Sequence, residues 1–133
     1  MDRIKKIQDL LYGAGEPMEG TAMGVEAAAA YVRERFSDTP FCIVRDWIWI
    51  DLELVEMGIQ MLRDNQLSPA MLYAHNVVYD SAHRYREIGG YVRTTPLLSF
   101  SEGFLFQTRN TMYVLLGKGV RKRATLEVVS SLL

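Results

Sequence analysis

The chain has 133 residues, of which 49% are hydrophobic and 23% are charged, and its 15 basic and 16 acidic residues leave a net charge of −1. These totals exclude a disordered or fibrous chain and argue against a uniformly basic nucleic-acid binder. A single cysteine, Cys42, cannot form an internal disulfide or supply a zinc site made of thiolates. Since no apolar run reaches about 20 residues and the first residues lack a signal peptide, we expect one soluble, cytoplasmic domain.

Two amphipathic helices are predicted near the start of the chain. In residues 1–12 and 22–36, apolar side chains recur every three or four positions, which is the period of a helix with one buried side. The intervening segment GAGEPMEG contains three glycines and a proline, and it is predicted to be a loop. Thr21 directly precedes the second helix and is its expected N-cap.

A strand and a third helix are expected next. Residues 41–50 (FCIVRDWIWI) are dense in aromatic and β-branched side chains, which favours a short strand. Asp51 is then the expected cap of a helix whose buried edge includes Val55 and which ends near Asn65. Because short apolar runs fit either structure, a helix that begins as early as Arg45 stays open as an alternative.

The second half of the chain predicts mainly strands. Residues 70–79 alternate between two faces, and residues 91–100 form a run in which Pro96 marks an edge or a bulge, because proline cannot donate to the ladder. Two apolar runs then flank Arg109 and Asn110, and this arrangement predicts a hairpin whose asparagine tolerates a left-handed backbone.

The end of the chain predicts a basic loop and a short helix. Residues 117–124 (GKGVRKRA) are expected to be the loop, and Thr125 the cap of a helix over 125–133. The expected fold class is therefore α+β, with N-terminal helices packed on an antiparallel sheet of about four to five strands and a short C-terminal helix. A chain of this size needs no metal, disulfide or cofactor to fold, and none is expected.

Charge is distributed unevenly along the chain. Residues 1–66 carry seven basic and twelve acidic side chains, whereas residues 67–133 carry eight basic and four acidic ones. The basic stretch after the last predicted strand is a candidate site for an anion, a nucleic-acid backbone or an acidic protein surface, and a solvated turn is the alternative. The candidate residues are Lys118, Arg121, Lys122 and Arg123, extended by Arg93, Arg109, Arg84 and Arg86, with Tyr85 and Tyr91 as stacking surfaces.

Two other groups of residues are candidates for function. His75, Asp80 and His83 lie close together in the sequence and could ligate a metal or act as base and orienting group, but they match no metal-binding motif such as HExxH. Trp47 and Trp49 lie on one side of the predicted strand, where core packing is the default interpretation. If they were exposed, they would be anchors for a protein partner.

Four short stretches of the second half share a family pattern, and they are 73–75 (YAH), 78–81 (VYDS), 90–97 (GYVRTTPL) and 108–117 (TRNTMYVLLG). These stretches resemble a small uncharacterised bacterial family of pseudomonads and mobile elements. The resemblance covers about a third of the chain, and it departs from the expected pattern at Gly90, where an aspartate precedes the aromatic residue in the family. It implies a bacterial or phage-related source and no assigned activity.

The sequence contains no complete catalytic motif, so the leading hypothesis is a non-enzymatic interaction protein that binds a larger protein partner. An inhibitor of a host defence complex, of the anti-CRISPR type, would suit the size and the implied source. One alternative is a nucleic-acid-binding or regulatory module that uses the basic loop. The other is a small enzyme that uses His75, Asp80 and His83.

Overall fold

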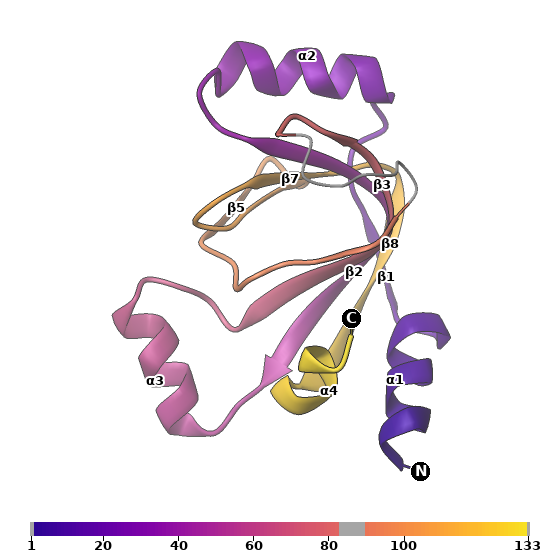
Figure 1. The fold of residues 1–133 in the computed structure, drawn as a ribbon, viewed down its shortest axis with the longest axis vertical. Helices are drawn as coiled ribbons and strands as arrows, with labels where there is room; N and C mark the ends of the chain where they lie inside the picture. Colours follow the sequence, from indigo (N-terminus) through magenta and orange to yellow (C-terminus); the bar gives the residue numbers. More distant parts are fainter. Residues whose placement is uncertain (1, 83–89, 133) are drawn as a thin grey trace.

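The computed structural model describes residues 2–82 and 90–132 as four helices and eight strands (Figure 1). The predicted α+β class is confirmed, although the strands outnumber the four to five expected. No helix within the described ranges is long and apolar enough to cross a membrane. The helices are α1 (Asp2–Tyr12), α2 (Val25–Arg35), α3 (Glu56–Asp64) and α4 (Leu126–Ser130). The strands are β1 (Glu16–Glu19), β2 (Phe41–Glu53), β3 (Ala70–Asp80), β4 (Val92–Arg93), β5 (Ser99–Ser101), β6 (Leu105–Gln107), β7 (Met112–Leu115) and β8 (Lys118–Thr125).

These strands form one sheet that is organised around β2. On one side β3 pairs with β2 in the antiparallel direction, and β4 follows β3. On the other side β2 runs parallel to β7 in its first half and parallel to β8 in its second half. β6 and β5 continue the sheet beyond β7, and β1 continues it beyond β8. The sheet is therefore mixed and not purely antiparallel, because the long chain between β2 and β7 lets the later strands return in the same direction.

An irregularity in the middle of β2 determines which side chains enter the core. Arg45 and Asp46 are both exposed, and Asp46 has a left-handed backbone with φ 53°. Val44 before this point and Trp47 and Trp49 after it all pack in the same cluster inside the curled sheet. Because successive side chains of a regular strand point to opposite faces, the irregularity shifts the alternation by one residue. That shift turns both tryptophans inward.

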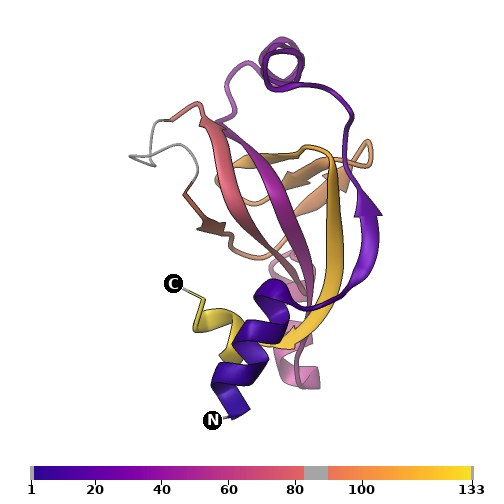
Figure 2. The same ribbon diagram turned by 90° about the vertical axis from the view of Figure 1, so that its right-hand side faces the viewer.

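Helices cover the outer face of the sheet at its two ends (Figures 1 and 2). α2 packs over one end through Ala28 and Val32, which share a cluster with Ile43. α1 and α4 lie side by side at the other end, where Leu10 and Val129 belong to a second outer cluster. The sheet therefore has three apolar clusters, one inside its curl and two beneath helices.

The run predicted around Pro96 is divided into β4 and β5, and the interruption expected at this proline is confirmed. The connecting segment bonds first to β3, where Thr94 N donates to Leu72 O at 2.9 Å. It then bonds to β6, where Leu98 N donates to Gln107 O at 2.7 Å. The segment thus links the two ends of the sheet and holds its curl.

Two threonine hydroxyls hold local turns in the last third of the chain. β6 and β7 form the predicted hairpin, and the Thr108 hydroxyl accepts from the N–H groups of Asn110 and Thr111 at 3.4 and 3.2 Å. Asn110 is not left-handed, which corrects that expectation, because the threonine side chain supplies the hydrogen bonds of the turn. The predicted cap of α4 is confirmed, since the Thr125 hydroxyl accepts from Val128 N at 3.3 Å.

The segment predicted as a loop before α2 contains β1, which pairs with β8. Thr21 extends this arrangement through an isolated bridge to Leu116. The backbone of Thr21 is therefore extended, and α2 begins at Val25, with Gly24 as its N-cap. The expected start at Ala22 with Thr21 as cap is wrong because pairing with the end of the β7 run competes with helix formation there.

The boundary between β2 and α3 also differs from the prediction. β2 continues to Glu53, since β3 and β8 pair with it on both sides through Asp51. Asp51 is therefore not a helix cap, and a helix starting at Arg45 is excluded. α3 begins after Val55, which is 77% exposed and not part of a buried edge.

Candidate functional site

The basic stretch that was expected to be a loop is strand β8. It pairs with β1 on one side and with β2 on the other, so it lies within the sheet. Gly119 marks a close approach between β8 and the core, because a Cβ atom at this position would lie 2.3 Å from Cδ2 of Trp47. The glycine that resembled a loop signal is therefore a packing requirement of the sheet.

Arg121 is bound to an acidic partner on the neighbouring strand. Its Nε and Nη2 atoms donate to Oδ2 and Oδ1 of Asp51 at 2.6 and 3.0 Å, and its guanidinium lies 5.3 Å from the ring centroid of Trp49. Partial burial opposes ionisation of Asp51, but hydrogen bonds from Arg121 and Trp49 outweigh it, so the pKa of this carboxyl is below its usual value. Much of the charge on Arg121 is therefore neutralised within the fold.

Lys122 is bound to the end of α1. Its Nζ atom donates to three backbone carbonyls, those of Asp9 at 2.8 Å, Leu10 at 2.7 Å and Gly13 at 2.5 Å. The last carbonyls of a helix have no partner within the helix, and a cation there also interacts favourably with the helix dipole. Burial lowers the pKa of Lys122, against the smaller effect of Asp9. This cation holds α1 on the sheet.

His75 takes part in the same attachment of α1. Its Nε2 atom lies 2.9 Å from the carbonyl oxygen of Leu11, which can only accept, and the ring of Tyr12 stacks on the imidazole at 5.4 Å. Asp80 is buried and accepts from Ala82 N at 3.3 Å. Residue 83 lies outside the described residues. Among those that are described, no group of three or more His, Cys, Asp or Glu side chains is arranged to hold a metal ion.

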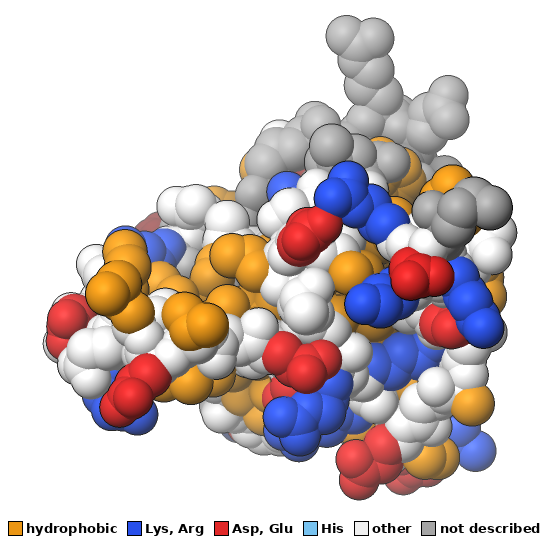
Figure 3. Space-filling view, turned by 90° about the horizontal axis from the view of Figure 1, so that it is seen from below, with side chains coloured by type: hydrophobic (Ala, Val, Ile, Leu, Met, Phe, Trp, Pro, Cys, Tyr) orange, Lys and Arg blue, Asp and Glu red, His pale blue; other side chains and the backbone are white. Residues whose placement is uncertain are grey.

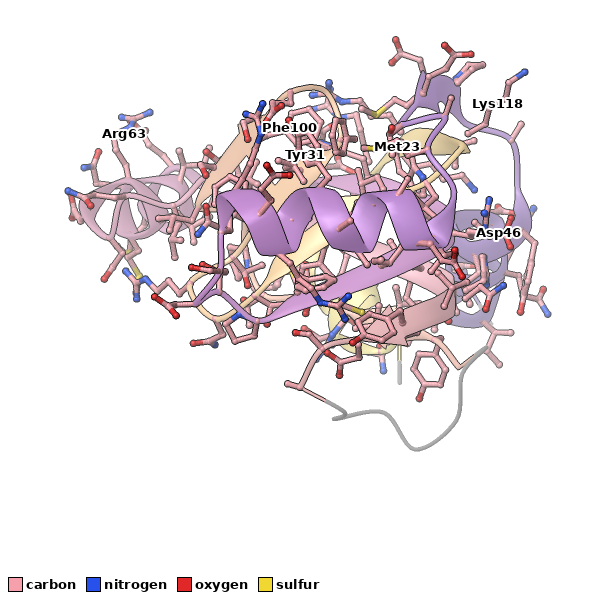
Figure 4. The ribbon with its side chains drawn as sticks, turned by 90° about the horizontal axis from the view of Figure 1, so that it is seen from above. Met23, Tyr31, Asp46, Arg63, Phe100 and Lys118 are labelled. Carbon is pink, nitrogen blue, oxygen red and sulfur yellow. The ribbon has the colours of Figure 1, made fainter. Side chains whose placement is uncertain are left out.

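The other predicted cations are dispersed over the molecule. Arg93 Nη1 donates to Val129 O of α4 at 3.2 Å, and Arg109 Nη2 donates at 2.8 Å to a backbone carbonyl just after α3. Lys118 is exposed at the start of β8, on the opposite side of the molecule from Arg63 of α3 (Figure 4). The described cations therefore do not form the single patch that was predicted. Tyr91 is half exposed and stacks on Tyr73, whereas Arg84, Tyr85 and Arg86 lie outside the described residues.

The two tryptophans are core residues. Trp47 is 1% exposed and Trp49 7% exposed, and the Trp47 Nε1 atom donates to Leu116 O at 3.1 Å. The default interpretation as core residues is therefore confirmed, and the alternative that the rings are exposed interface aromatics is wrong. The left-handed turn of the backbone at Asp46 is the reason both rings face inward.

An open groove of ≈ 580 Å³ lies where β8 meets the two helices at the end of the sheet. Its surroundings contain both signs of charge, which Figure 3 shows as interspersed blue and red side chains around α1 and α4. Arg123 lies on its floor, is exposed and makes no ion pair with any described residue. The basic side chains of the lining are Lys6, Arg121, Lys122 and Arg123, and the acidic ones are Asp9, Glu16 and Glu53.

α3 is the second candidate surface, and it stands away from the sheet (Figure 1). None of its nine residues, all of them described, is buried. Met57 and Met61 lie one turn apart and are 75% and 62% exposed, and Figure 3 shows hydrophobic side chains gathered on this projection. α3 is held mainly through Leu54, which packs in an outer cluster, and through the turn after the helix, where Leu67 N donates to Leu62 O at 2.8 Å.

The interpretation of the sequence missed Met57 and Met61, although the pattern contained a signal. The apolar positions of the segment cover more than one helical face, since residues 57 and 61 lie on a different side of the helix from Ile59 and Leu62. A helix that rests on a sheet through one edge cannot bury so wide an apolar surface. The width of the apolar surface of this helix therefore indicated that some of its apolar side chains are exposed.

The fold is thus a curled mixed sheet in which Arg93, Arg121 and Lys122 bond to other parts of the same chain. The chain belongs to the family described as "Domain of unknown function (DUF6957)", which matches residues 19–131. The expected resemblance to an uncharacterised family is confirmed. No curated protein and no solved structure matches the chain.

Proposed function

We propose that this chain is a non-enzymatic interaction protein that binds a larger protein partner through the exposed apolar side of α3. One observation carries the proposal: Met57 and Met61 are largely exposed on a helix in which no described residue is buried. Amphipathic helices commonly place their apolar side in a groove of the partner. Methionine suits this role because its flexible thioether adapts to irregular surfaces.

The charges around α3 define the chemistry of the partner. Glu53, Glu56 and Asp64 are exposed on or beside the helix, and Arg63 is the basic residue of α3. Glu53 and Glu56 make no ion pair with a described residue. Complementary charges guide association and disfavour wrong partners. The partner therefore offers an apolar cleft with basic residues along its rim.

The proposal places the protein in the cytoplasm of a bacterium and gives it a phage or mobile-element origin. Its narrowest form is an inhibitor of a host defence complex, of the anti-CRISPR type. Support for this form comes from the size of the chain and from the resemblance of residues 73–117 to a family of pseudomonads and mobile elements. An inhibitor of this kind acts by occupying a surface of a larger complex, which a projecting helix suits.

The two alternative functions have less support. Nucleic-acid binding requires free cations on one side of the molecule, but Arg121 is bound to Asp51 and Lys122 to the end of α1. An enzymatic role requires groups that converge on a substrate, but Nε2 of His75 is bound to the carbonyl of Leu11. The following experiment also tests the nucleic-acid alternative, and the enzymatic role remains a prediction.

The test is a capture experiment with tagged protein in lysate of the source bacterium, treated with nuclease. The wild-type chain is compared with the double variant Met57→Ser, Met61→Ser, and the captured protein is then purified for affinity measurements. We expect one stoichiometric partner that the double variant binds about 30-fold more weakly, as for the loss of an interface hot spot. Charge reversal of the acidic rim by Glu56→Lys is expected to weaken the same complex.

The matched control is Ile4→Ser, which changes a residue that is 60% exposed on α1. It is expected to leave the affinity unchanged. The proposal fails if the double variant and the wild type bind the partner equally. Recovery of nucleic acid that disappears after nuclease treatment or at raised salt would favour the nucleic-acid alternative instead.

A further inference from the structure

The groove beside β8 lies along a part of the strand that β1 does not cover. β1 pairs with β8 only from Lys118 to Arg121, whereas β2 pairs along the opposite side as far as Thr125. The outer side of residues 123–125 therefore borders the groove of ≈ 580 Å³ and has no neighbouring strand, whereas Gly15 lies against Lys122. An uncovered strand edge presents backbone groups to which another extended chain can bond.

The pairing pattern identifies which backbone groups face the groove. Gly20 N donates to Gly117 O at 2.7 Å, so the odd-numbered residues of this strand are those that bond towards β1. Pro17 agrees with this pattern, because it lies opposite Val120 and has no N–H to donate. Arg123 is the next odd-numbered residue beyond β1. Its N–H and C=O point towards the groove, and no described strand residue pairs with them on that side.

We propose that an extended peptide segment of a partner protein binds in this groove by pairing with Arg123, antiparallel to β8 and in line with β1. Addition of a strand to an open sheet edge is a common mode of peptide recognition, in which backbone hydrogen bonds supply affinity and side chains supply specificity. The site is separate from α3 and does not depend on the function proposed for that helix.

The side chains around the groove define the sequence of the peptide. Residues directly opposite each other in an antiparallel pair share one face of the sheet, and within this chain Glu16 lies opposite Arg121. The peptide residue opposite Arg123 is accordingly acidic, because this guanidinium is exposed and makes no ion pair with a described residue. The peptide residue before it faces the lining residues Leu10 and Val128 and is apolar.

A peptide fits the groove better than a free anion does. Two of the four basic lining residues, Arg121 and Lys122, already bond to Asp51 and to the carbonyls of α1. Acidic side chains also border the groove, so a lone phosphate meets little net positive charge. An extended chain instead satisfies the unpaired backbone groups of Arg123 and places a single carboxylate beside its guanidinium.

The test is an NMR titration of the whole ¹⁵N-labelled chain with the capped peptide acetyl-Thr-Val-Glu-amide, which ends before the positions held by Gly15 and Glu16. We expect the amide signal of Arg123 to shift on binding. Methylation of the glutamate nitrogen of the peptide removes a hydrogen bond to β8 and adds a methyl group at the edge, and it is expected to weaken binding at least about tenfold. Methylation of the preceding valine nitrogen, which faces away from β8, is the matched control and is expected to have a much smaller effect.

A charge exchange tests the side-chain part of the proposal. Arg123→Glu is expected to bind the parent peptide more weakly and the version with lysine in place of glutamate more tightly, whereas Arg63→Glu on α3 is expected to change neither. The proposal is overturned if the peptide does not bind, or if both methylated peptides bind equally well. It is also overturned if inorganic phosphate alone produces the same shifts as the peptide, because the groove would then be an anion site.

Discussion

β8 and α3 are both partly exposed, but they relate to the rest of the molecule in opposite ways. β8 carries four cations in eight residues, and two of them, Arg121 and Lys122, are bonded within the fold. α3 is amphipathic, yet none of its described residues is buried, and Met57 and Met61 face solvent. Half of the cations of β8 are thus bonded within the fold, whereas the methionines of α3 lie at the surface.

Charge and hydropathy therefore indicate function only after the contacts of each residue are known. A cation that donates to the carbonyls at the end of a helix is not available to a ligand. An apolar side chain that packs against nothing is available to a partner.

The core beneath β8 is expected to be the most sensitive to substitution. Gly119 of β8 lies against the indole of Trp47, which is 1% exposed. Trp47→Ala is therefore expected to lower the free energy of unfolding by about 3–5 kcal/mol, because it leaves a large cavity. Urea unfolding followed by circular dichroism measures this change. A loss below about 1 kcal/mol would place the ring at the surface.

The bond between β8 and α1 is expected to have the next largest effect. Lys122→Met keeps the aliphatic stem but removes three hydrogen bonds from a charged donor, and it is expected to cost about 2 kcal/mol of stability. Lys118→Met, at the exposed start of the same strand, is the control and is expected to change stability by less than about 0.5 kcal/mol. Equal effects of the two variants would show that Lys122 has no structural role.

Acid is expected to weaken the pair between β8 and β2. The pKa of Asp51 is lower in the folded chain than the value of about 3.9 for an unfolded aspartate. The ionised carboxylate therefore stabilises the fold above about pH 4, and this contribution is lost as the pH falls through the folded pKa. Asp51→Asn should thus lose less stability than the wild type below pH 4 in urea unfolding at a series of pH values. Asp38→Asn is the control, and parallel curves for wild type and Asp51→Asn would contradict the prediction.

The smallest effect is expected on α3. The double variant Met57→Ser, Met61→Ser is expected to cost less than about 1 kcal/mol in total, which reflects the lower helix propensity of serine at exposed positions. The same variant is expected to bind the partner much more weakly, so stability and binding separate at this helix. A loss of more than about 2 kcal/mol in thermal or urea unfolding would mean that both methionines pack in the core.

Local features of the fold were predictable from the sequence because they depend on neighbouring residues. Periodicity identified α1 and β3, and the apolar runs around Arg109 identified the hairpin. The Thr125 cap and the interruption at Pro96 followed from the chemistry of single residues. Where these local signals competed with pairing to distant strands, as at Thr21 and Asp51, distant pairing prevailed.

The sequence predicted where the candidate site lies along the chain, but not which contacts its basic residues make. The basic stretch 117–124 does border the groove. The charge of the chain and its family membership also follow from the sequence alone. The contacts of Arg121 with Asp51, 70 positions away, and of Lys122 with the carbonyl of Leu10, 112 positions away, are visible only in the folded chain. Periodicity and spacing carry information over one or two turns of chain, whereas these contacts depend on how β8 and α1 meet in space.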